Sequence, residues 1–99
     1  MAKYTNITSS GSATTLIPKG GTRSGFVATI SVSNNSANPA TIILDLFDGD
    51  ETQYYICKNV VIPAGVVLVL SDNLSFDAKT YNLRIYNTGS SPDLTVIIK

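Results

Sequence analysis

From residue 26 onward, apolar residues recur at every second position in a series of short segments. In the segment 26–33, one face carries Phe26, Ala28, Ile30 and Val32, and the intervening residues form the other. A period of two predicts a β-strand with one buried face. Comparable segments follow at 41–47, 52–62, 65–70, 81–86 and 94–98, with a shorter one at 74–76.

Turn-forming residues separate these segments at intervals typical of a β-sandwich. Asp48-Gly49-Asp50 lies between two apolar runs and predicts a hairpin, and Pro63 ends a strand because it has no backbone donor. No window shows the 3.6-residue period of a helix. The sequence therefore predicts an all-β fold, an antiparallel β-sandwich or small jelly roll of about seven or eight strands, in one domain.

The first 25 residues have a weaker pattern. Ile7, Leu16 and Ile17 are the aliphatic anchors among Thr, Ser, Gly and Lys. Two interpretations stay open: an edge strand with loose flanks, or an arm that becomes ordered on a neighbouring subunit. We therefore divide the single domain into an N-terminal arm and edge strand, residues 1–25, and a β-sandwich body, residues 26–99.

Several predicted strands carry apolar residues on both faces, whereas a two-layer sandwich normally alternates apolar and polar faces. One set predicts the core: Phe26, Ile30, Leu44, Ile56, Leu68, Leu83, Ile85 and Val96. The second set comprises Ile43, Phe47, Val67, Val69 and Ile97. Because exposed apolar patches usually mark contacts, we expect the second set to meet a covering segment or a partner chain. A homo-oligomer, or docking onto a larger protein, is the corresponding prediction.

Charge is scarce and balanced. Seven Lys and Arg residues offset seven Asp and Glu residues, and charged residues make up 14% of the chain. Nucleic-acid binding and attachment to an anionic membrane both require a basic surface, so we expect neither partner. The chain has no His, which removes the commonest general base and transition-metal ligand. We expect no enzymatic activity and no cofactor.

Two features could nevertheless carry chemistry. Asp45, Asp48, Asp50 and Glu51 concentrate carboxylates that could bind Ca²⁺. Asp-Gly-Asp is also common hairpin chemistry, and the full twelve-residue calcium loop is absent from the sequence, so we predict no metal. Cys57 lies mid-strand with no His to activate it, and we expect an inert thiol.

The tyrosines leave a further alternative open. Aromatic rings can stack on sugars, so a carbohydrate-binding module remains possible, although packing between strands accounts for the same residues. They are Tyr4, Tyr54, Tyr55, Tyr81 and Tyr86.

A longer pattern adds a resemblance. The stretch 55–70 runs through Ile62-Pro63-Ala64-Gly65, where one strand ends and the next begins at once. With segments 27–34, 74–76 and 94–98, it resembles small β-sandwich virion proteins of tailed bacteriophages, including those that infect cyanobacteria. The resemblance covers roughly residues 26–98.

This resemblance implies a non-enzymatic structural role, first as a capsid decoration or cement protein that stabilises the shell. A neck, tail or baseplate accessory protein, or a carbohydrate- or receptor-binding module on the tail, is the alternative. The implied partners are the major capsid protein or other virion proteins. The implied location is the virion, after synthesis in the host cytoplasm, and no catalytic residue is implied.

Overall fold

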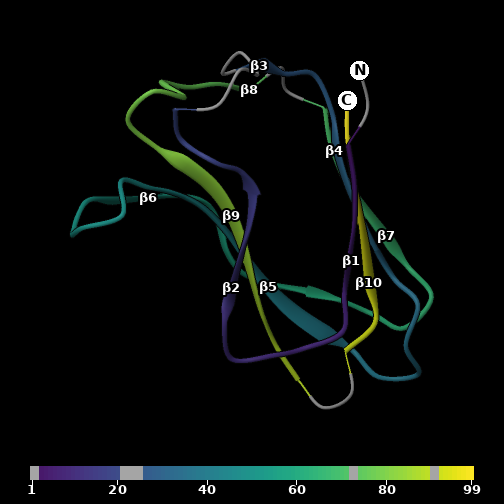
Figure 1. Ribbon diagram of the computed structural model, residues 1–99. Coiled ribbons are helices and arrows are strands. Elements are labelled where there is room, and N and C mark those ends of the chain that lie inside the picture. Colours follow the sequence, from purple (N-terminus) through teal and green to yellow (C-terminus); the bar gives the residue numbers. More distant parts are fainter. Residues whose placement is uncertain (1–2, 21–25, 72–73, 90–91) are drawn as a thin grey trace.

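The computed structural model describes residues 3–20, 26–71, 74–89 and 92–99 (Figure 1). Over these residues the chain forms ten strands and no helix, hence none that could cross a membrane. They are β1 (Lys3–Ile7), β2 (Ala13–Ile17), β3 (Phe26–Val27), β4 (Ile30–Asn34), β5 (Ala40–Phe47), β6 (Gln53–Ile62), β7 (Val67–Leu70), β8 (Leu74–Ser75), β9 (Asn82–Thr88) and β10 (Leu94–Ile98).

Eight of these strands form two four-stranded antiparallel sheets that face each other. Sheet A has the order β1-β10-β4-β7, and sheet B has the order β2-β9-β5-β6. The two-residue strands β3 and β8 pair at one end of the sandwich (Figure 1). The predicted all-β sandwich is confirmed. The strand count exceeds the expected seven or eight because the segment 26–33 forms two strands, β3 and β4, and the N-terminal segment forms two, β1 and β2.

The topology is that of a jelly roll. Each strand pairs with its mirror image along the chain: β1 with β10, β2 with β9, β3 with β8, β4 with β7 and β5 with β6. The chain is thus one long hairpin, closed by the turn between β5 and β6. The hairpin is rolled up, so that the pairs β1–β10 and β4–β7 lie in sheet A and the pairs β2–β9 and β5–β6 lie in sheet B. Rolling adds the pairs β4–β10 and β5–β9.

The core lies between the two sheets and follows from the alternation within each strand. Of the predicted core residues, five are buried: Ile30, Leu44, Leu83, Ile85 and Val96. Ile56 and Leu68 lie on the edge strands β6 and β7, where they are only partly buried against this core. The side chain of Phe26 lies outside the described part of the chain.

The N-terminal strands belong to the same core. β1 and β2 are edge strands of sheets A and B, and they bury Ile7, Leu16 and Ile17 between the sheets. The sandwich described by the structure therefore includes residues 3–17 as well as the segments after residue 26.

The segment 26–33, expected as one strand, is divided at Ala28 and Thr29. The carbonyl of Lys99 accepts hydrogen bonds from both backbone N–H groups, at 2.8 and 3.3 Å, and the N–H of Lys99 donates to Thr29 at 2.9 Å. Val27 pairs with β8, whereas Ile30 pairs with β7 and β10. The strand divides because the chain changes pairing partners at this point.

Candidate functional site

The outward-facing side chains of sheet A form two rows that cross all four strands. One row contains Tyr4, Ile97, Ser31 and Val69, and the other contains Asn6, Thr95, Ser33 and Val67. None of these eight residues is charged. We refer to these eight residues as the sheet A outer face.

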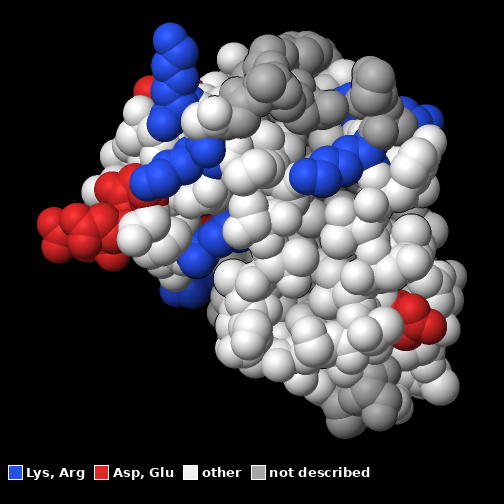
Figure 2. Space-filling model, in the orientation of Figure 1, with Lys and Arg blue, Asp and Glu red and all other residues white. Residues whose placement is uncertain are grey.

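Large apolar groups on this face are open to solvent. Tyr4 is 71% exposed, Val67 52% and Val69 54%, while Ile97 is half-buried between neighbouring strands. In Figure 2 the red and blue side chains gather mainly over the hairpin between β5 and β6 and over the upper part of the molecule. Burying these valines and this tyrosine against a partner would remove apolar surface from water at no cost in charge desolvation.

Three polar side chains of the same face, Asn6, Thr95 and Ser33, already take part in hydrogen bonds. Thr95 Oγ1 accepts a hydrogen bond from Asn35 Nδ2 at 2.9 Å and donates one to Asn6 Oδ1 at 2.9 Å. Ser33 Oγ donates to Asn35 Oδ1 at 3.2 Å. Because these groups already have partners, covering them costs less than covering unpaired polar groups. The face is therefore suited to being buried.

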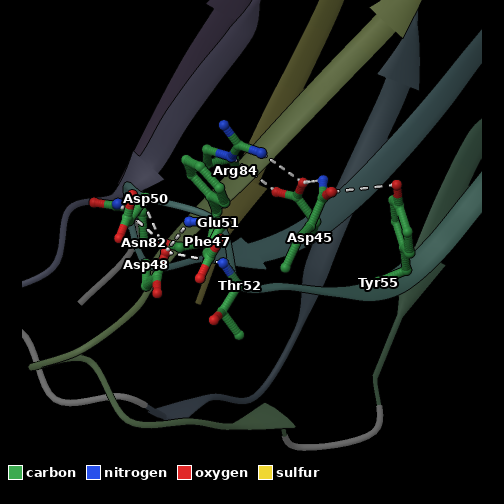
Figure 3. A network of polar contacts seen from close by, with 10 residues as sticks. Asp45, Phe47, Asp48, Asp50, Glu51, Thr52, Tyr55, Asn82 and Arg84 are labelled. Carbon is green, nitrogen blue, oxygen red and sulfur yellow. Dashed lines mark hydrogen bonds and ion pairs between the residues drawn. The ribbon is translucent and has the colours of Figure 1, made fainter.

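Sheet B carries a different outer face, centred on an ion pair. The Arg84 guanidinium donates from Nε to Asp45 Oδ1 at 3.0 Å and from Nη2 to Asp45 Oδ2 at 2.7 Å (Figure 3). The side-chain amide of Gln53 also donates to Asp45 Oδ2, and the Tyr55 hydroxyl donates to Gln53 Oε1 at 3.3 Å. Arg84 lies over the Phe47 ring, 4.1 Å from its centroid.

This network leaves little chemistry available at Asp45. The residue is only 3% exposed, and both of its carboxylate oxygens accept hydrogen bonds from neighbouring side chains. A general base needs a free lone pair within reach of a substrate proton. The arrangement instead balances a buried charge and holds the Arg84 guanidinium over the Phe47 ring.

A shallow, open depression of about 340 Å³ lies beside this network. Its lining includes Ile43, Tyr55, Arg84 and Tyr86, and residues 11–13 border it. Aromatic rings next to planar polar groups can bind a sugar ring. The depression is thus the second surface of the molecule with a recognisable binding chemistry.

The other three acids of the predicted cluster, Asp48, Asp50 and Glu51, lie in the β5–β6 hairpin. Asp48 Oδ1 accepts hydrogen bonds from the backbone N–H groups of Asp50 at 2.8 Å, Glu51 at 3.1 Å and Thr52 at 3.2 Å. These hydrogen bonds, chiefly that from Asp50, hold the pKa of Asp48 below its ordinary value. Among the residues that the structure describes, no group of three or more His, Cys, Asp or Glu side chains could share a metal ion.

The predicted thiol lies partly buried on β6. Burial raises the pKa of Cys57 above its ordinary value, which lowers the thiolate fraction at neutral pH. Its strand neighbours offer no imidazole, since the chain contains none.

The five predicted interface residues do not form one patch. Val67, Val69 and Ile97 lie on the sheet A outer face, with Val69 and Ile97 on either side of Ser31. Ile43 and Phe47 lie on the outer face of sheet B, where Ile43 lines the depression and Arg84 covers Phe47. The strand order separates the two groups onto opposite sides of the sandwich.

Two functional features were not predicted. The sequence marks Tyr4 only as a possible stacking residue, whereas in the structure it lies on the sheet A outer face and is the most exposed aromatic residue among those described. Asp45 was grouped with the hairpin acids, yet it pairs with Arg84. The available signal was parity, since Asp45 alternates with buried Leu44 and partly buried Leu46, as Arg84 alternates with buried Leu83 and Ile85.

A scan against protein-family models and a search of curated proteins gave no match.

Proposed function

We propose that this protein is a non-enzymatic structural component of a phage virion, a capsid decoration protein that docks through the sheet A outer face. The observation that supports the proposal is the composition of this face. It is uncharged, exposes Tyr4, Val67 and Val69, and has polar groups that already take part in hydrogen bonds. A cement protein needs a rigid scaffold and an apolar face, and needs neither a cleft nor a cofactor.

The side-chain chemistry is consistent with a non-enzymatic role. Asp45 is neutralised by Arg84, and the pKa of Cys57 is raised by burial. Neither residue is activated for general-base or nucleophilic catalysis. A neck, tail or baseplate position would use the same apolar face, and the proposal extends to that placement as its nearest alternative.

Retention on purified particles tests the proposal. The double variant Val67→Ser/Val69→Ser should be lost from particles during gradient purification, while Val61→Ser should be retained like the wild type. Val61 is the matched control, because it is a valine of similar exposure, 57%, on sheet B. Absence of the wild-type chain from purified particles, or equal retention of both variants, would refute the proposal.

The depression on sheet B supports a second candidate, a carbohydrate- or receptor-binding module. Tyr55 and Tyr86 flank it, next to the exposed part of Arg84. Binding to an array of bacterial surface polysaccharides, with loss of binding in Tyr55→Ala, would favour this function. Absence of binding across the array would leave decoration as the better account.

A further inference from the structure

One edge strand lacks the features that normally prevent strands of different molecules from pairing. The two sheets end in β1, β7, β2 and β6. β2 and β6 contain register shifts, and β6 also carries exposed Lys58 and Asn59, the latter with a φ of 57°. β1 begins with Lys3. β7 has a continuous register and contains neither charge nor proline, the protections that edge strands commonly use.

The open backbone groups of β7 can be identified. The N–H of Asn34 donates to the carbonyl of Val66 at 2.9 Å. Alternate residues of an antiparallel strand direct both backbone groups to the same neighbour, so Leu68 and Leu70, two and four residues after Val66, face β4. Val67 and Val69 therefore direct their N–H and C=O groups to the free edge of sheet A.

We propose that β7 pairs with β7 of a second copy of this chain, antiparallel, about a two-fold axis at Leu68. In this register Val67 lies opposite Val69 of the second copy, and each such pair exchanges two backbone hydrogen bonds. All the open groups of the two strands are used. Side chains match as well, because valine meets valine on the outer face and Leu68 meets Leu68 on the inner face.

The size of the sheet A outer face favours a second copy as the partner at the β7 edge of this sheet. Four strands spaced about 4.8 Å apart and five residues rising about 3.4 Å each give a face of roughly 19 by 17 Å. That is well below the roughly 800 Å² per partner of a standard interface. Pairing joins two such faces into one eight-stranded uncharged surface. This advantage rests on the proposed docking function, whereas the pairing of β7 does not.

Disulfide cross-linking tests the register directly. In a Cys57→Ser background, Val67→Cys and Val69→Cys chains are mixed and oxidised at micromolar concentration. The proposed register places residues 67 and 69 of different copies about 5.5 Å apart, within disulfide range, while like positions lie beyond about 7 Å. We expect the mixed dimer to form several-fold faster than either dimer of like variants. Equal rates, or faster dimers of like variants, would overturn the proposal.

A pair of substitutions at Val69 separates backbone pairing from side-chain docking. Val69→Pro keeps an apolar side chain and removes the open N–H, whereas Val69→Thr keeps the N–H and the branched shape. By sedimentation equilibrium we expect the wild type to dimerise, Val69→Pro to weaken the dimer by about thirtyfold or more, and Val69→Thr by less than about fivefold.

Failure of the β7 pairing can be distinguished from failure of the proposed docking function. Weak dimers are detectable at protein concentrations up to roughly 100 µM. If the wild-type chain is still monomeric at that concentration, the pairing is overturned, even if the chain binds particles. A dimer that withstands Val69→Pro also overturns it. Thermal melting of Val69→Pro checks that the variant is folded. If it is not folded, the cross-linking experiment alone tests the pairing.

Discussion

Replacing Arg84 by methionine should lower the free energy of unfolding by about 3–5 kcal/mol, the range for leaving one member of a buried ion pair without its partner. Asp45 is 3% exposed, and Arg84 supplies two of the three side-chain hydrogen bonds that its carboxylate accepts. Methionine retains an unbranched apolar side chain, so the lost guanidinium, with its ion pair to Asp45 and its contact with the Phe47 ring, is the main change. Only the amide of Gln53 would remain to bond the buried charge.

A double variant provides the control. Asp45→Leu combined with Arg84→Met removes both charges, and it should recover stability to within about 1–2 kcal/mol of the wild type. Urea unfolding at pH 7, with a complete double-mutant cycle, measures both effects. A loss below about 1 kcal/mol in Arg84→Met, or a double variant as unstable as the single one, would refute the reasoning.

Three further predictions follow from burial and from the pKa shifts. Leu83→Ala should lower the free energy of unfolding by about 2–5 kcal/mol, because the side chain is fully buried. Val67→Ser and Val69→Ser should each lower it by less than about 1 kcal/mol, as measured by urea unfolding. Equal losses would contradict the assignment of Leu83 to the core and of the two valines to the outer face. The lowered pKa of Asp48 makes its carboxylate stabilising above the unfolded-state pKa of about 3.9, and this contribution is lost as the pH falls through the lower folded-state pKa. Asp48→Asn should therefore flatten the fall in Tm below pH 4, and parallel pH profiles would argue against it. Because its pKa is raised, Cys57 should react with iodoacetamide more slowly than free cysteine does at pH 7.5, which is roughly one unit below the pKa of a free thiol. Equal rates would contradict the raised pKa.

The strands and the core could be predicted because both depend on local alternation. Leu44, Leu83 and Val96 are apolar members of segments with a period of two, and they lie in the core. Partial burial of Leu68 was not predictable, because it depends on β7 being the last strand of sheet A. Strand order is a property of distant segments, and no local pattern encodes it.

The candidate surfaces were predictable only in part, for the same reason. Parity placed Val67 and Ile43 on the faces turned away from the core, and the structure has both on outer faces. The assignment of one to sheet A and the other to sheet B followed from the rolled hairpin. The partnership of Asp45 with Arg84 likewise required β5 and β9 to be neighbours, 39 positions apart.

A cryo-EM map of the purified virion provides the most direct test of the central claim. The account predicts density for this jelly roll on the particle, with Tyr4, Val67 and Val69 of the sheet A outer face buried against another protein. It also predicts that the β5–β6 hairpin, with Asp48 at its start, projects into solvent. A particle in which the sheet A outer face is open to solvent, while sheet B makes the contact, would contradict the account.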